Sequence, residues 1–164
     1  MKTERLHLVR LILPLIPETK CFGLKRRLFR WAGARVGSDV RICSSVRIYG
    51  GGELRIGRGT WIGHETLVVA SADVCIGEFV DIAPQVFIGT GSHVISQNGK
   101  KRAGNGFSQN ISIGDGAWIC ANAVVTAGVN IGDMALVAAC SVVLSDIPKN
   151  VMYAGNPAVL KKEF

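Results

Sequence analysis

The chain contains only three histidines, His7, His64 and His93, and the last of them stands where a regular pattern breaks. A histidine side chain changes its charge near neutral pH, which suits it to act as a general base. His93 begins a polar, glycine-rich segment after IGTGS, whereas His64 lies within the regular part, in IGHET. Alternatively, His93 only makes local hydrogen bonds within a loop. His64 alternatively occupies a solvated turn and has no role in catalysis.

Acidic residues close to this break could orient a histidine base. Glu65, Asp81 and Asp73 are the candidates, and each also fits a solvated turn position. The five cysteines form no CxxC motif, and several of them are interpreted as small buried residues. Because the chain also lacks a closely spaced pair of histidines, we expect no metal ion.

The elements that must position these residues are predicted by an aliphatic repeat. From residue 36 onward an aliphatic residue recurs at every sixth position, with two residues added after each of the first two groups of three. The repeat stops over residues 89–112 and then resumes. The fifteen positions are Val36, Ile42, Ile48, Ile56, Ile62, Val68, Ile76, Ile82, Ile88, Ile113, Ile119, Val125, Ile131, Val137 and Val143.

A six-residue aliphatic repeat is typical of one flat face of a coil. Small residues often follow the aliphatic one, and small or β-branched residues often stand four positions after it. Three faces of about six residues make one triangular turn, and stacked turns bury a continuous aliphatic column. The period therefore predicts a parallel β-helix over residues 36–164, interrupted by a loop at 89–112. A helix would need a period near 3.6 residues.

Residues 1–35 form a separate, basic segment. They hold nine Lys and Arg but two acids, whereas basic and acidic residues balance in the rest of the chain. This distribution argues against a nucleic-acid-binding protein. Helical spacing of Leu24, Leu28 and Trp31 predicts a helix that Gly33 can end, after a shorter helix around 3–13. The pair could cover the first turn of the coil or lie on an anionic membrane surface.

The apolar run at residues 6–16 is too short to cross a bilayer. Arg10 and Pro14 interrupt it, and no convincing signal-peptide cleavage site follows. We therefore expect a cytoplasmic protein, with the inner face of the membrane as a possible location.

Four stretches carry a resemblance to a known family. The runs IGRGTWIG, IGEFVDIAPQV, ISIGDGAWICANAVVTAGVNIGDMALVAACSVV and DIPKNVMYAGNPA are similar to the hexapeptide-repeat acyltransferases. The match is closest to sugar and polysaccharide O-acetyltransferases of the galactoside and maltose acetyltransferase type. The resemblance implies a left-handed β-helix with an N-terminal helical segment, an extruded loop and a short C-terminal helix. It also implies a homotrimer that uses acetyl-CoA, with active sites between neighbouring coils.

The resemblance assigns roles to individual positions. His93 matches the family's general base at the start of the loop. In the acceptor pocket, Gly63 and Ser71 stand where well-studied relatives carry Asn and Asp, which leaves Glu65, Asp81 and His64 as candidates. The groove for coenzyme A (CoA) is assigned to Trp118, Ala121 and Ala139, with Ser145 where relatives often carry a lysine and with Lys161 as a candidate phosphate partner.

Acetyl transfer from a thioester to a hydroxyl needs a base, an oxyanion donor and two aligned substrates. We therefore predict an acetyl-CoA-dependent O-acetyltransferase that acts on a saccharide or lipid-linked sugar by direct transfer. An N-acetyltransferase acting on an amino- or nucleotide-sugar is the close alternative. A non-catalytic β-helix scaffold is the alternative of a different class.

Overall fold

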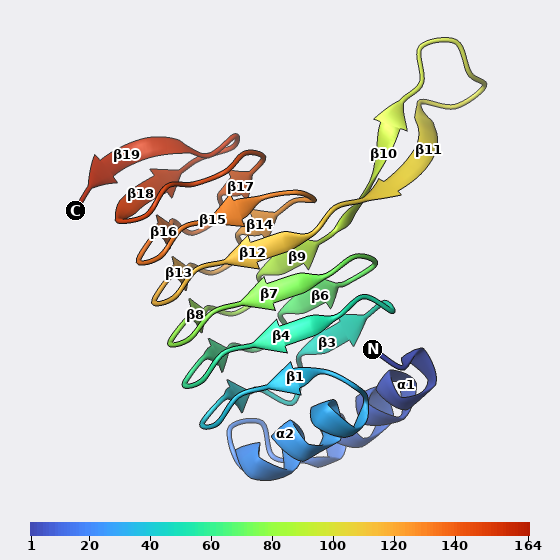
Figure 1. Cartoon of the computed structure of the whole chain (residues 1–164), viewed down its shortest axis with the longest axis vertical. Coiled ribbons are helices and arrows are strands. Elements are labelled where there is room, and N and C mark those ends of the chain that lie inside the picture. The colour runs from blue at the N-terminus through green and yellow to red at the C-terminus, as the bar shows by residue number, and fades with distance from the viewer.

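Short strands wind around three faces of a prism in the computed structural model, which describes all 164 residues (Figure 1). Each turn contributes one strand to each of three parallel sheets. The first sheet contains β1 (Arg35–Val36), β4 (Leu54–Ile56), β7 (Val74–Ile76), β12 (Ile111–Ile113) and β15 (Asn130–Ile131). The second begins with β2 (Arg41–Ile42), β5 (Trp61–Ile62), β8 (Asp81–Ile82), β13 (Trp118–Ile119) and β16 (Leu136–Val137). The third contains β3 (Arg47–Tyr49), β6 (Leu67–Val69), β9 (Phe87–Gly89), β14 (Val124–Val125) and β17 (Val142–Val143).

The aliphatic repeat forms the interior of this coil, as predicted. All fifteen repeat positions are buried, and they pair in register from one coil to the next, as Ile62 does with Ile82 and Ile82 with Ile119. Neighbouring coils approach so closely that a Cβ built on Gly57 would lie 2.4 Å from the carbonyl carbon of Gly77. The small residues after the aliphatic positions are therefore needed for the coils to stack.

The interruption of the repeat is a β-hairpin that leaves the coil without disturbing it. Strands β10 (Gly91–Ile95) and β11 (Ala103–Ser108) pair antiparallel and project from the corner between the third and first sheets (Figure 1). The backbone closes the base of the hairpin where Gln109 N–H donates to Thr90 O at 2.8 Å. Strand β12 then pairs with β7, with Ile113 opposite Ile76, so the stack continues in register.

The N-terminal segment folds against the first coil. Helix α1 (Thr3–Ile12) and the 3₁₀ helix η1 (Leu13–Leu15) are followed by α2 (Phe22–Trp31), and these helices lie at the lower end of the coil in Figure 1. Helix α1 contacts β3, and α2 contacts β1 and β2. An uncovered solenoid exposes its apolar core at its ends, so the helices cover apolar surface of the first coil. Neither helix has the length and continuous apolar character needed to cross a lipid bilayer.

The buried face of α2 differs from the predicted one. Leu24 and Trp31 are about half exposed, whereas Lys25 and Phe29 are fully buried. The ammonium group of Lys25 donates to the carbonyl oxygens of Pro17 and Glu18, at 3.1 and 2.6 Å. These backbone acceptors make the burial of a lysine tolerable.

The predicted C-terminal helix was wrong. The chain instead ends in β18 (Val151–Ala154), which extends the second sheet in parallel with β16, and β19 (Val159–Glu163), which pairs antiparallel with β18. Unlike a helix, these strands continue the backbone hydrogen bonding of the last coil. The antiparallel pair therefore places a short β-hairpin at the far end of the second sheet.

Candidate functional site

His93 lies on the projecting hairpin, and its ring is held by the backbone. The ring Nδ1 lies 2.9 Å from Gly104 O on the opposite strand. A carbonyl oxygen only accepts hydrogen bonds, so in a neutral ring Nδ1 carries the proton and donates. Nε2 then has a free lone pair and can accept a proton from a substrate. This arrangement is the one that a general base requires.

The surroundings of His93 are open and made of small groups. Gly106 is its partner in the β10–β11 register, and a Cβ built there would lie 3.7 Å from the imidazole ring. A shallow pocket lies on this face of the hairpin, and all of its lining residues are exposed. It is lined by Gly91, Ser92, His93, Gly106, Phe107 and Ser108.

The residues assigned to the CoA groove lie together on successive coils. Ala121 and Ala139 occupy the corner between the second and third sheets, where Cys140 N–H donates to Ala121 O at 2.9 Å. Trp118 stands at the start of β13 and is half exposed. It pairs in register with Asp81, so the indole and this carboxylate lie on the same outer face of neighbouring coils.

The other candidate positions are dispersed. Ser145 is exposed beyond β17, and Lys161 is exposed on β19. Glu65 accepts a hydrogen bond from Gln85 Nε2 at 2.7 Å, so its carboxylate forms part of a ladder along one corner. His64 is only half-buried, and its Nδ1 lies 3.2 Å from a carboxylate oxygen of Glu18.

Within one chain the structure does not bring His93 to the CoA residues. The hairpin leaves the corner between the third and first sheets, whereas Ala121 and Ala139 form the corner between the second and third sheets. Figure 1 shows the hairpin and β13 on opposite sides of the coil. His93 and these residues thus form no common site within one chain.

The interpretation of several cysteines as buried residues needs correction. Cys43 is buried and Cys120 half-buried, but Cys75 and Cys140 are exposed, as is Cys21 in the N-terminal segment. Cys75 lies at the middle position of a strand with alternating burial, so its side chain points outward. Burial raises the pKa of the Cys43 thiol to about 11, which makes this thiol a poor nucleophile at neutral pH.

The contact between His64 and Glu18 was missed from the sequence. The two residues are 46 positions apart, in the coil and in the N-terminal segment, and no motif links them. A regular period predicts which residues share a coil corner, but it carries no information on a segment outside the repeat that packs against that corner.

Comparisons with known proteins agree with this architecture. No protein-family profile matches the chain. A relative in Escherichia coli K12, named "Putative colanic acid biosynthesis acetyltransferase WcaF", is 34% identical over 139 residues, which are 83% of this chain and 72% of the relative.

Two solved structures are also similar. A hexapeptide-repeat acetyltransferase from Vibrio cholerae in complex with acetyl-CoA superposes with a TM-score of 0.85 at 26% identity, covering 98% of this chain and 86% of the other. A galactoside acetyltransferase in complex with CoA superposes with a TM-score of 0.87 at 28% identity, and the match covers 99% of this chain and 80% of the other. The coil is thus the left-handed parallel β-helix predicted from the resemblance, and the chain belongs to the hexapeptide-repeat acetyltransferases.

Proposed function

We propose that the protein transfers an acetyl group from acetyl-CoA to a hydroxyl group of a saccharide, with His93 as the general base. The hydrogen bond between His93 Nδ1 and Gly104 O carries this proposal, because it leaves Nε2 free to accept a proton. The relatives named above add the substrate class, since two of them are named for galactoside and colanic acid chemistry. Acetyl-CoA and CoA are bound by the two solved relatives.

The reaction needs no covalent acyl-enzyme. Nε2 of His93 accepts the proton of the acceptor hydroxyl while its oxygen attacks the thioester carbonyl carbon. A tetrahedral intermediate forms, and its collapse breaks the carbon–sulfur bond. The leaving thiolate takes the proton from the imidazolium, so the products are the sugar acetate and CoA with a free thiol. The hydrogen bond to Gly104 orients the ring through both proton transfers.

The complete site lies between subunits of a homotrimer in this proposal. His93 projects away from its own coil, and the small residues Ala121 and Ala139 lie at another corner. A hairpin that reaches a neighbouring coil places His93 beside that coil's CoA groove. The two alanines leave the backbone accessible to the pantetheine chain, and Trp118 forms a wall of the channel. Lys161 and Ser145 are the proposed contacts of the nucleotide end.

The chemical stability of the product tests whether the acetyl group is transferred to an oxygen or a nitrogen atom. We expect release of CoA thiol from acetyl-CoA in the presence of saccharides that carry only hydroxyl groups, and a product that mild alkali hydrolyses. An ester is cleaved under such conditions, whereas an amide survives. Thiol release can be followed with a thiol reagent, and the product by mass spectrometry before and after alkali. An alkali-stable product formed only with amino-sugars would instead establish the N-acetyltransferase, and thiol release with neither class would favour a scaffold.

The N-terminal segment is proposed to bind an anionic membrane surface as well as to cover the coil. Leu8, Leu11 and Leu15 are exposed at helical spacing along α1 and η1, on the side away from buried Leu6 and Val9. The surrounding segment carries an excess of seven positive charges. Apolar side chains flanked by basic residues are typical of helices that lie in the headgroup region. Such binding would bring the enzyme to lipid-linked sugar acceptors at the inner face of the membrane.

Vesicle flotation tests this binding with point variants of the full chain. We expect the protein to float with phosphatidylglycerol vesicles but not with phosphatidylcholine vesicles, because each basic residue near an anionic surface contributes about 1 kcal/mol. The double variant Leu11→Glu, Leu15→Glu should no longer float. Leu144→Glu is the matched control, since Leu144 is equally exposed at the other end of the coil. Equal flotation of all three proteins, or of none, would contradict the proposal.

A further inference from the structure

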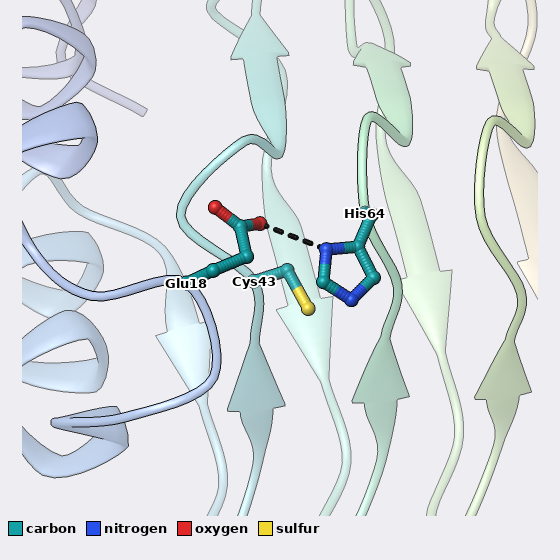
Figure 2. A group of neighbouring side chains, drawn as sticks. All are labelled: Glu18, Cys43 and His64. Carbon is teal, nitrogen blue, oxygen red and sulfur yellow. Dashed lines mark ion pairs between the residues drawn. The ribbon is translucent and has the colours of Figure 1, made fainter.

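Three side chains that can bind metal ions meet at the lower end of the coil, away from the hairpin. Glu18 precedes α2, Cys43 follows β2, and His64 follows β5. Figure 2 shows the carboxylate, the thiol and the imidazole converging from these three segments. One ligand atom from each residue lies within 4.8 Å of the other two.

We propose that Glu18, Cys43 and His64 bind a Zn²⁺ ion. Thiolate sulfur, imidazole nitrogen and carboxylate oxygen are the donors that zinc prefers, and three protein ligands leave a fourth position for water. With metal–ligand bonds of 2.0–2.3 Å, the donor atoms of a tetrahedral site are about 3.3–3.7 Å apart. His64 Nδ1 and the Glu18 oxygen already lie 3.2 Å apart. Small side-chain adjustments would therefore complete the geometry.

The Glu18 carboxylate is held in place by hydrogen bonds from a neighbouring residue. Ser45 donates from its backbone N–H and its hydroxyl group to the same Glu18 oxygen, at 3.0 and 2.5 Å. Hydrogen bonds of this kind orient ligands in metal sites. The Glu18 and His64 side chains are 38% and 43% exposed, which gives an ion a path from solvent, whereas Cys43 is buried beneath them.

Lys25 lies beside this cluster, since its ammonium group donates a hydrogen bond to the backbone oxygen of Glu18. Its ammonium group is bound by the carbonyl oxygens of Pro17 and Glu18 and not by the Glu18 carboxylate. Binding of the ion would release the proton of the Cys43 thiol, and the carboxylate and the resulting thiolate would together carry two negative charges, which neutralise a divalent ion. The backbone carbonyl groups that already bind the ammonium group would continue to stabilise the charge of Lys25.

A metal ion here would join the N-terminal segment to the first two coils. Its ligands are separated by 25 and 21 residues in the sequence, so the ion would close two long loops. Ligands that bind only the folded chain stabilise it, and we therefore expect the ion to stabilise the contact between the N-terminal segment and the coil. The expectation of no metal rested on the absence of ligands that are close in the sequence, whereas these three ligands are distant in the sequence. The zinc site does not depend on the proposed acetyl transfer.

The experiment uses the full chain after treatment with a chelator. Calorimetric titration with Zn²⁺ should show one ion bound per chain. Thermal unfolding should show a higher melting temperature with Zn²⁺ than without it. Cobalt bound in place of zinc should show a thiolate-to-cobalt charge-transfer band and the visible absorption of a tetrahedral complex. We expect Cys43→Ser to remove the charge-transfer band, and His64→Gln and Glu18→Gln each to weaken binding at least about tenfold.

The matched control is Cys75→Ser, which removes an exposed thiol outside the cluster and should leave the affinity and the band unchanged. His64→Gln alters a partly exposed side chain, so it tests the proposal even if Cys43→Ser fails to fold. Unchanged zinc affinity in both the His64 and Glu18 variants would overturn the proposal. So would a wild-type chain that does not bind zinc, or a charge-transfer band lost in the Cys75 variant.

Discussion

Replacement of His93 with alanine is expected to slow acetyl transfer by roughly 100- to 10,000-fold, the usual effect of losing a general base. The side chain is exposed and its ring makes one hydrogen bond, to Gly104 O, so the variant should fold like the wild type. The loss should appear in kcat, because the base acts on the acceptor hydroxyl in the transition state and contributes little to ground-state binding. Thiol release at saturating acetyl-CoA measures it.

The matched control for His93→Ala is His7→Ala. His7 is also exposed, but it lies on α1, where its Nδ1 is 3.2 Å from a guanidinium nitrogen of Arg10. This variant should keep wild-type activity. A His93→Ala enzyme within a few-fold of wild type would contradict the role assigned to His93.

The proposed arrangement between subunits makes the activity recoverable by mixing. An Ala121→Trp variant should be inactive because the indole fills the proposed CoA groove, while its His93 remains intact. When His93→Ala and Ala121→Trp chains are unfolded, mixed and refolded together, some interfaces should combine the intact hairpin of one chain with the intact groove of the other. We expect the mixture to be far more active than either variant alone, although less active than the wild type. A mixture as inactive as its components would contradict the proposed site between subunits.

Replacement of Ile82 with alanine should destabilise the protein by about 2–5 kcal/mol, the range measured for such changes in well-packed cores. Ile82 is fully buried and sits in the middle of the column, between Ile62 of the coil before and Ile119 of the coil after. Because the backbones of adjacent coils are joined by hydrogen bonds, they cannot collapse into the space that the side chain leaves. Urea unfolding followed by circular dichroism gives the free energy of unfolding.

Leu15→Ala is the control for Ile82→Ala. It removes an aliphatic side chain that is 84% exposed, and it should change the free energy of unfolding by less than about 0.5 kcal/mol. Equal effects of the two substitutions would mean that the aliphatic column is not the principal source of stability.

The periodic part of the fold could be predicted because one local rule repeats. Each strand of the coil is only two or three residues long, and it contains one inward repeat position, which is aliphatic in every case from Val36 to Val143. The position of the segment that carries His93 could also be predicted, since the aliphatic period stops there and polar, glycine-rich sequence replaces it, but the segment was expected to be a loop and not a β-hairpin. These features depend on neighbours within one turn of the coil, which the order of residues records directly.

Features outside the repeat were less predictable. The helix spacing of α2 was recognised, but not its buried face, because the acceptors that permit Lys25 to be buried are backbone carbonyls of the preceding segment. The C-terminal strands were expected to be a helix, although backbone groups of β16 were available to pair with β18. In both cases a tertiary contact outweighed local pattern.

The sequence by itself thus determined the β-helix, the place of the hairpin and the histidine on it, because a regular period and its interruption are properties of the chain. Only the tertiary structure decided that Gly104 fixes the tautomer of His93 and that Glu18, Cys43 and His64 meet. It also showed that His93 and Ala121 lie at different corners of one chain. These relations join residues that are distant in the sequence or outside the repeat, and their geometry is set by how the segments pack against one another.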